Sequence, residues 1–310
     1  MPEFASGGLR GFDGGVHPFT KLPLPVNPAL EGKSVDPNTV NIRHLLTHTS
    51  GLAPWRPTYL LHPIPLPDQP DPVPPHIRHA SVIASVCASP FVDYPGNTVR
   101  YSDLGFMLLG ECVQRLTELP LDAAVNERIA KPLGLATLTY NPLQNSFSPV
   151  NIAPTEYDFV WRLRRCWGEV DDENACGMGG IAGHAGLYAA ALDIATFGEA
   201  WRTRNSQLGI SEAVWVEATR YQAGTDDLRG LGWKIYEEAV DPEEPQPLPE
   251  ASSRSGIPSG YFGHTGFTGT SLRIDLKRGI TIACLTNRVY YGRDPQGIEA
   301  FRIALHALFT

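Results

Sequence analysis

The sequence predicts an α/β fold of the α+β type, in which an antiparallel sheet is flanked by helices. Its clearest signal is a β-hairpin: residues 268–275 and 280–286 are rich in β-branched side chains, and the polar turn between them ends in Gly279, which can adopt a positive φ. Apolar residues recur at helical spacing over 76–89 and 104–116. We therefore expect C-terminal strands to pack against helices contributed by the rest of the chain.

Composition sets the size of the fold and argues against several partners. With 310 residues and 42% hydrophobic content, the chain can bury a large core as a single domain, with a mainly helical part at 42–227 and the strands and last helix at 228–310. The net charge of -8 argues against nucleic acid or an anionic membrane as the main partner. No apolar run approaches the roughly 20 residues of a membrane span.

The cysteines and the N-terminus bear on the cellular compartment. The first 15 residues contain neither the positively charged nor the apolar region of a signal peptide, so none is expected in this chain, and the localisation stays open because an export signal could precede it. The cysteines are odd in number, widely spaced and mostly in apolar segments, which predicts buried thiols instead of disulfides or metal ligands. They are Cys87, Cys112, Cys166, Cys176 and Cys284.

The remaining elements follow from caps, chain breakers and periodicity. A short helix is predicted to begin after the N-cap residue Asn41 and to end at Gly51. Residues 52–75 contain nine prolines, which predicts an extended surface excursion. Further predictions are helices at 121–130, 192–201, 211–219 and 298–308, a strand at 230–237, and loops at 176–186 and 242–259. In the two long helices, the residues expected to face the core are Ile77, Ala80, Ile83, Ala84 and Cys87, then Leu104, Met107, Leu108, Cys112 and Leu116.

The start of the predicted hairpin carries the first candidate site. Gly263, His264, Thr265 and Gly266 place small residues, an imidazole and a hydroxyl where the first strand begins, and glycine within a strand often marks the close approach of a ligand. A plain bend with a surface histidine explains the same spacing equally well. The second strand, 280–286, is nearly continuous in apolar residues, which predicts that both of its faces are covered.

Familiar catalytic and cofactor motifs do not explain this chain. No serine lies in a G-x-S-x-G motif, and no H-E-x-x-H motif occurs. His44 and His48 could share a helix face, but no carboxylate base lies between them, so capping and packing are favoured over a metal site. Gly177-x-Gly179-x-x-Ala182 matches a relaxed dinucleotide fingerprint but follows no predicted strand. Neither a metal nor a cofactor is therefore expected.

Five separated segments, taken in order, resemble one family. They are NIRHLLTHTSGL at 41–52, YSDLG at 101–105, KPLGL at 131–135, DDENACGMGGIAGHAGL at 171–187 and GHTGFTGT at 263–270. Together they are similar to the serine β-lactamase-related superfamily of penicillin-binding-protein-like hydrolases, esterases and peptidases, in the branch whose third motif is H-T-G. The resemblance covers most of the chain and implies a β-lactamase/transpeptidase-like fold with a helical subdomain beside the sheet.

The resemblance implies catalytic roles for two residues at the second motif. Tyr101 would shuttle a proton between a serine nucleophile and the leaving group. Because a free phenol has a pKa of about 10, a neighbouring ammonium would be needed to lower it. Asp103 would orient the substrate or a lysine by hydrogen bonding. The alternative is that Ser102 and Asp103 only cap a helix and that Tyr101 is a half-buried aromatic residue.

At the third motif, the resemblance implies a substrate-binding strand. His264, Thr265 and Gly266 would line the strand edge against which the acyl group lies, and the backbone N–H of Phe267 would be one oxyanion donor. An imidazole at position 264, with its ordinary pKa of about 6.5, is mostly neutral at pH 7. This favours an esterase- or peptidase-like activity over penicillin hydrolysis.

The sequence departs from the family at the nucleophile. The family's serine lies three residues before a lysine at the start of a buried helix. No lysine of this chain has a serine at that distance; the lysines are at 21, 33, 131, 234 and 277. Residues 1–4, MPEF, resemble the segment that follows the catalytic helix in the family. We therefore expect an N-terminally incomplete chain that is inactive and unstable alone, and a sheet edge left unpaired through which it can associate.

Two functional readings follow. The first is a serine acyl-hydrolase (an esterase, peptidase or β-lactamase-like enzyme working through an acyl-enzyme) whose substrate, once the chain is completed, is a small ester, amide or peptide-like molecule. The second is a non-catalytic binding or scaffold protein that retains the family cleft. A probe that labels active-site serines distinguishes the two readings.

Overall fold

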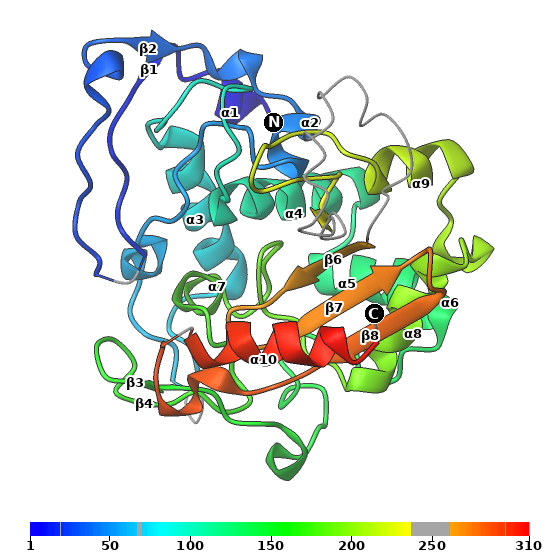
Figure 1. Ribbon diagram of the computed structural model, residues 1–310. Helices are drawn as coiled ribbons and strands as arrows, with labels where there is room; N and C mark the ends of the chain where they lie inside the picture. Colours follow the sequence, from blue (N-terminus) through cyan, green and yellow to red (C-terminus); the bar gives the residue numbers. More distant parts are fainter. Residues whose placement is uncertain (19, 67–69, 237–260, 295, 310) are drawn as a thin grey trace.

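In the computed structural model, the described residues are 1–18, 20–66, 70–236, 261–294 and 296–309, so the predicted loop at 242–259 lies outside them. Within these residues an antiparallel sheet of four strands lies beside a helical region, as Figure 1 shows, which confirms the predicted mixture of helices and antiparallel strands. The helices are α1 (Pro2–Ala5), α2 (Ile42–Leu46), α3 (Pro75–Ala88), α4 (Asp103–Thr117), α5 (Leu121–Val125), α6 (Lys131–Leu133), α7 (Glu173–Gly177), α8 (Ala191–Arg202), α9 (Glu212–Thr219) and α10 (Gln296–Ala307). A π-helical segment, Asn126–Ala130, joins α5 to α6.

Strands β5 to β8 form the main sheet and pair antiparallel in chain order. Their bounds are β5 (Lys234–Tyr236), β6 (Tyr261–Thr265), β7 (Ser271–Asp275) and β8 (Ile280–Cys284). Two short ladders lie elsewhere: β1 (Arg10–Gly11) with β2 (Ser34–Val35), and β3 (Tyr157–Asp158) with β4 (Arg164–Arg165). The predicted strand at 230–237 is therefore shorter than expected.

The predicted hairpin is correct for β7 and β8, but the strand before it was missed. Residues 261–265 form β6, and a tight turn at 266–270 leads from it into β7. Gly269 makes this turn possible: its φ is +113°, and a Cβ there would lie 2.4 Å from the Thr286 hydroxyl. His264 consequently lies inside the sheet, opposite Leu272, and not at the start of a strand.

The prediction that both faces of the last strand are covered is wrong. Every residue of β8 is partly exposed, because β8 is an edge strand of the sheet within the described residues. Helix α8 packs closely on β7 and β8, and a Cβ on Gly198 would come within 2.7 Å of both the Leu272 and the Thr281 side chains.

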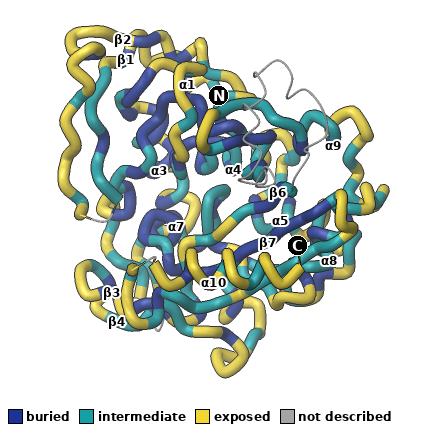
Figure 2. Tube along the Cα trace, in the orientation of Figure 1, coloured by how far each residue is buried: buried dark blue, intermediate teal, exposed yellow. Residues whose placement is uncertain are grey.

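Helix α10 lies on the opposite side of the sheet from α8 and is largely exposed (Figures 1 and 2). Its Arg302 Nη2 donates hydrogen bonds to the backbone oxygens of Gly266, at 3.1 Å, and Thr270, at 2.7 Å. These two contacts tie α10 to the turn between β6 and β7.

Two hydrophobic clusters support the fold. One surrounds α3 and α4 and includes Leu52, Val82, Val86, Phe91, Leu104, Met107 and Leu108. The other lies between the sheet and helices α8 and α9 and includes Trp215, Trp233, Phe262 and Ile274. The candidate site residues at the start of α4 and in β6 come from elements anchored in these two clusters.

The predicted core stripes of α3 and α4 are only partly correct. In α3, Ile77 is exposed while Arg78 is fully buried, because Asp71 pairs with its guanidinium at 2.6 Å. In α4, Leu116 is 85% exposed in the last turn of the helix, which ends at Thr117. Apolar spacing cannot reveal a paired buried charge or how far along a helix its packing partners extend.

The five cysteines are free thiols, as predicted, although Cys112 and Cys284 are only partly buried. Among the residues that the structure describes, none of the helices combines the length and the hydropathy that crossing a bilayer requires.

His48 connects the end of the first motif to the start of α4. Its ring is buried, and its Nδ1 accepts the Ser102 backbone N–H at 3.0 Å. The ring also stacks against Tyr101, with centroids 4.4 Å apart, and against Phe106, at 4.9 Å. Burial lowers the pKa of His48 to about 3, and the positive charge of Arg229 adds to this effect. The imidazole is therefore neutral at physiological pH and acts as an acceptor.

The glycine-dense segment after α7 packs directly on α4. A Cβ on Gly183 would lie 2.1 Å from the Phe106 carbonyl oxygen and 2.8 Å from the Gly110 nitrogen. Because both of these are backbone atoms of a helix, they cannot move aside cheaply. The predicted close-packed loop is confirmed at this position.

We expect Gly183→Ala to lower the free energy of unfolding by about 1–3 kcal/mol, since the added methyl overpacks the contact with α4. Gly297→Ala is the control, because a Cβ there meets nothing within 4 Å and alanine favours the helix. Urea unfolding followed by circular dichroism measures both. Equal stability of the two variants would contradict the packing described here.

His48 also predicts a pH dependence of stability. Its pKa is lower in the folded chain than in the unfolded one, so its contribution is present above about pH 6.5 and is lost as the pH falls toward 3. Between pH 7 and pH 5, the wild type should lose about 2 kcal/mol more than His48→Gln. Substitution of the exposed His76 by glutamine is the control, and it should follow the wild type.

Candidate active site

Tyr101 lies directly before α4, at the meeting point of residues from distant parts of the chain. Its side chain packs on His48, as described above, and its ring centroid is 6.1 Å from that of His264 in β6. The guanidinium carbon of Arg229 lies 5.6 Å from the Tyr101 ring centroid. The structure thus brings together the second and third motifs, which the sequence separates by more than 150 residues.

The Tyr101 phenol is held in its protonated form. Although 43% of the residue is exposed, desolvation by the surrounding protein raises the pKa of Tyr101, and the Asp103 carboxylate raises it further. The Arg229 charge opposes the shift but does not reverse it. The cation found near this phenol is a guanidinium, whereas the resemblance implies an ammonium.

His264 is a neutral imidazole with both nitrogens engaged. Its Nε2 lies 3.4 Å from Arg229 Nη1, and its Nδ1 lies 2.9 Å from the Thr265 carbonyl oxygen. Since a guanidinium only donates, Nε2 accepts and Nδ1–H donates. Burial lowers the pKa of His264, and the charge of Arg229 lowers it further. The imidazole therefore carries no charge near pH 7.

Arg229 is a buried cation in this region, and the sequence analysis did not identify it. It is 5% exposed, and its Nε and Nη2 donate to Asp227 Oδ2 at 3.1 and 2.5 Å. Lys234 Nζ lies 3.4 Å from the other carboxylate oxygen of Asp227. The two cations and one anion leave a net positive charge behind His264. Only the position of Arg229 beside a predicted strand could have drawn attention to it.

Thr265, Gly266 and Phe267 form the end of β6 and the turn after it. Thr265 is exposed, and Phe267 is 40% exposed with its carbonyl oxygen accepting from Arg288 Nε at 2.6 Å. The Gly266 N–H donates to the Thr270 carbonyl oxygen at 2.7 Å and is therefore committed to the turn. The assignment of the Phe267 N–H as an oxyanion donor stays a prediction.

Ser102 and Asp103 have different environments. The Ser102 hydroxyl is buried; it donates to the Ala53 carbonyl oxygen at 2.7 Å and accepts the Gly105 N–H at 3.3 Å, which makes Ser102 the N-cap of α4. Asp103 is the first residue of the helix, and burial raises the pKa of its carboxyl to about 6. The capping interpretation thus holds for Ser102, but it does not account for the raised pKa of Asp103.

The groups that act on Asp103 come from the fourth motif. Asp172 and Glu173 raise the pKa of Asp103, and His184 lowers it. Asp172 is the N-cap of α7 and accepts the Ala175 N–H at 2.7 Å, while His184 Nε2 lies 2.9 Å from the same Asp172 oxygen. The sequence analysis recognised this motif but assigned no role to its residues.

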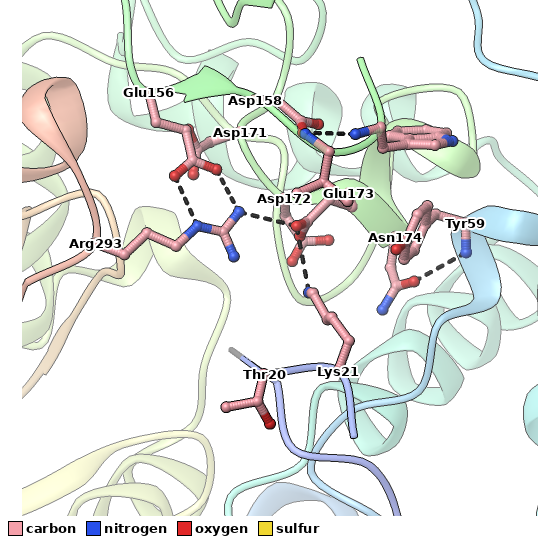
Figure 3. Close-up of polar contacts among 12 residues, drawn as sticks. Thr20, Lys21, Tyr59, Glu156, Asp158, Asp171, Asp172, Glu173, Asn174 and Arg293 are labelled. Atoms are coloured by element: carbon pink, nitrogen blue, oxygen red, sulfur yellow. Dashed lines mark hydrogen bonds and ion pairs between the residues drawn. The ribbon is translucent and has the colours of Figure 1, made fainter. Parts of the chain in front are cut away.

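Glu173 belongs to a network of charges that Figure 3 shows in detail. Its Oε1 lies 3.3 Å from Lys21 Nζ and 2.9 Å from Arg293 Nη2, and Arg293 Nε donates to Glu156 at 2.7 Å. Lys21 Nζ also lies 3.7 Å from the centroid of the Trp55 ring. The network joins the N-terminal loop, α7 and the segment before α10.

The two histidines that raised the question of a metal have separate partners. His44 Nδ1 accepts the Asn41 N–H at 3.4 Å in a capping box, and His48 Nδ1 accepts from Ser102. Within the described part of the chain, no group of three or more His, Cys, Asp or Glu side chains is placed to hold a metal ion.

The family model described as Beta-lactamase matches residues 22–306. A "Putative D-alanyl-D-alanine carboxypeptidase" of Escherichia coli K12 is 32% identical over 288 residues, which cover 87% of this chain and 61% of the relative. A protein of the same description from Salmonella agona is 32% identical over 223 residues, covering 67% of this chain and 50% of the relative. The chain thus spans between half and two thirds of the length of these curated relatives.

Solved structures share the fold. Simvastatin synthase from Aspergillus terreus aligns with a TM-score of 0.60 at 20% identity, over 99% of this chain and 75% of that one. A D-stereospecific amidohydrolase from Streptomyces aligns with a TM-score of 0.57 at 21% identity, over 85% and 72%. These likenesses confirm the predicted β-lactamase/transpeptidase-like fold, and the match of the family model over residues 22–306 shows that the chain belongs to the Beta-lactamase family.

Proposed function

We propose that this chain forms the substrate-binding and proton-transfer wall of a serine acyl-hydrolase cleft that accepts small ester, amide or peptide-like substrates. The observation that carries the proposal is the meeting of Tyr101 with His264 and the buried Arg229. A protein that used these segments only for capping and packing would not need a phenol, an imidazole and a cation at one position.

In this proposal each group has a distinct task. A serine oxygen attacks the substrate carbonyl, and its proton passes through the Tyr101 hydroxyl to the leaving group. Tyr101 is protonated at neutral pH, so it is ready to donate and needs a nearby ammonium before it can accept. The Asp103 carboxylate orients that ammonium, and the exposed edge at Thr265 receives the acyl group.

The acylating serine in this proposal lies outside these 310 residues. No serine precedes a lysine by three residues, and the hydroxyl of Ser102, the serine adjacent to Tyr101, is buried in two hydrogen bonds. We therefore expect no acyl-enzyme from this chain alone.

The positive charge around His264 favours a substrate with an anionic group near the scissile bond. Arg229 and Lys234 outnumber Asp227 there, which supplies the positive charge that the neutral His264 lacks. A peptide ending in D-alanyl-D-alanine, the substrate in the name of the curated relatives, carries such a carboxylate.

A non-catalytic binding protein is the second candidate, and one observation favours it. The pKa of Tyr101 is raised, not lowered, so in this chain the phenol cannot act as a base near pH 7. The discriminating experiment is reaction with a fluorophosphonate probe. Labelling should be absent from residues 1–310 and present when a longer gene product contains a Ser-x-x-Lys motif. Labelling of the 310-residue chain would contradict the proposed location of the serine.

In a product that carries the motif, Tyr101→Phe should reduce the rate of ester hydrolysis by about 10²–10⁴-fold, since the proton shuttle is lost. Tyr291→Phe is the matched control, because Tyr291 is 97% exposed and its ring contact is with Tyr290, and it should hydrolyse p-nitrophenyl acetate at the wild-type rate. Full activity of Tyr101→Phe would remove this residue from the mechanism.

The buried Asp103 carboxylate should lower the free energy of unfolding at neutral pH. Its folded pKa of about 6 exceeds the ordinary value of 3.8, so its stabilising contribution is present below about pH 4 and is lost as the pH rises through 6. Asp103→Asn should match the wild type at pH 4 and exceed its free energy of unfolding by about 2–3 kcal/mol at pH 7.5. Asp226→Asn, at an exposed position, should show no such pH-dependent difference.

A further inference from the structure

The turn that follows β6 is fixed through its carbonyl oxygens. All five residues of the turn, 266–270, accept a hydrogen bond at their main-chain oxygen. Three of these bonds come from main-chain or hydroxyl donors: Arg288 N–H to Thr268 at 3.0 Å, the Thr286 hydroxyl to Gly269 at 2.7 Å, and Gly266 N–H to Thr270 at 2.7 Å. Arginine side chains bind the oxygens of the other two residues, Gly266 and Phe267.

The first of these arginines, Arg302, reaches the turn from α10. Its Nη2 donates to the Gly266 oxygen at 3.1 Å and to the Thr270 oxygen at 2.7 Å, which are the first and last carbonyls of the turn. The Gly269 N–H also donates to the Gly266 oxygen, at 3.2 Å. These two donors occupy both lone pairs of that oxygen. The Gly266 carbonyl therefore cannot rotate without breaking a charge-assisted hydrogen bond.

The second arginine, Arg288, holds the next peptide group. Its Nε donates to the Phe267 oxygen at 2.6 Å, and its guanidinium carbon lies 4.6 Å from the centroid of the Phe267 ring. Its Nη1 donates to the carbonyl oxygens of Arg293 and Asp294, each at 3.1 Å. In all of these hydrogen bonds the guanidinium faces carbonyl oxygens. It thus joins the turn to the segment before α10.

These contacts determine the direction of the Phe267 N–H. In a trans peptide the C=O of one residue and the N–H of the next lie in one plane and point in opposite directions, and the described residues contain no cis peptide bond. Because Arg302 holds the Gly266 oxygen, the Phe267 N–H points away from that guanidinium. Because Arg288 holds the Phe267 oxygen, the peptide plane on the other side of Phe267 is fixed as well. A cation bound at the carbonyl oxygen also polarises the peptide group and strengthens its N–H as a donor.

We propose that Arg302 and Arg288 are positioning residues that orient and polarise the Phe267 N–H as a donor to the oxyanion of the acyl-transfer reaction. The inference rests on the proposed function, and within it on the predicted role of that N–H. An oxyanion donor stabilises the transition state only when its direction is set in advance. The two arginines would set it through main-chain atoms of the third motif.

The test is NMR spectroscopy of the 310-residue chain labelled with ¹³C and ¹⁵N, followed at two successive peptide groups. Arg302→Gln should shift the Gly266 carbonyl ¹³C and the Phe267 amide ¹⁵N upfield, because a charged donor is lost, and should leave the next peptide group unchanged. Arg288→Gln should instead shift the Phe267 carbonyl ¹³C and the Thr268 amide ¹⁵N. Arg204→Gln is the matched control, since this arginine pairs with Glu212 and lies over Trp215, and it should change neither group.

The crossed pattern separates positioning from general support of the fold. If the two arginines only stabilised the turn, each substitution would loosen all of it, and both peptide groups would change together in both variants. That result, or unchanged resonances, overturns the inference. If a glutamine variant does not fold, Arg302→Lys and Arg288→Lys take its place, because they keep the charge and lose the planar fork of donors. They should give the same crossed pattern with smaller shifts, and its absence overturns the inference equally.

Kinetics tests whether the oriented N–H is used. In the gene product that carries a Ser-x-x-Lys motif, Arg302→Gln should lower kcat for p-nitrophenyl acetate by about tenfold and leave KM unchanged, because an oxyanion donor acts in the transition state. An unchanged kcat overturns the inference even where the NMR pattern is found. Neither result affects the fluorophosphonate labelling or the Tyr101→Phe experiment, so failure of the proposed function would be seen separately.

Discussion

The candidate site depends on one hydrogen bond, in which the Ser102 backbone N–H donates to Nδ1 of the buried His48. This bond requires a neutral imidazole, because a proton on Nδ1 would place two donors face to face. The same ring supports Tyr101 on one side and Phe106 on the other, so it fixes the direction in which α4 leaves the first motif. The positions of Tyr101 and Asp103 follow from that direction. His48, which has no task in the proposed reaction, thus fixes the positions of two residues that do.

Much of the fold could be predicted because its signals are local. Gly279 marks the β7–β8 turn, and Asn41 and Ser102 cap helices as their residue types suggest. Strand β6 escaped prediction because residues 261–265, YFGHT, include a glycine and a histidine and lack regular alternation, and the strand is defined by pairing with β7. The core stripes were misjudged where burial depends on a distant partner, as for Arg78 with Asp71.

In the candidate site, too, local motifs could be predicted from the sequence, whereas contacts between distant residues could not. Ordered motifs were enough to predict that Tyr101 and His264 share one site, and in the structure their ring centroids are 6.1 Å apart. Arg229 and His184 were not assigned roles, because their partners are far away in the sequence. No local spacing encodes these contacts: Arg229 lies beside His264 and Tyr101, and His184 pairs with Asp172. Such pairings become visible only when the chain is folded.

The two hydrogen bonds from Arg302 to the backbone oxygens of Gly266 and Thr270 make the C-terminal helix a brace for the third motif. The brace holds main-chain atoms, so it constrains the shape of the loop whatever side chains the loop displays. A displacement of α10 would therefore be transmitted through this arginine to the end of β6, the strand that we propose receives the acyl group. Under that proposal, the accuracy required at β6 limits how far the C-terminal helix can change, even though the helix contributes none of the proposed reacting groups.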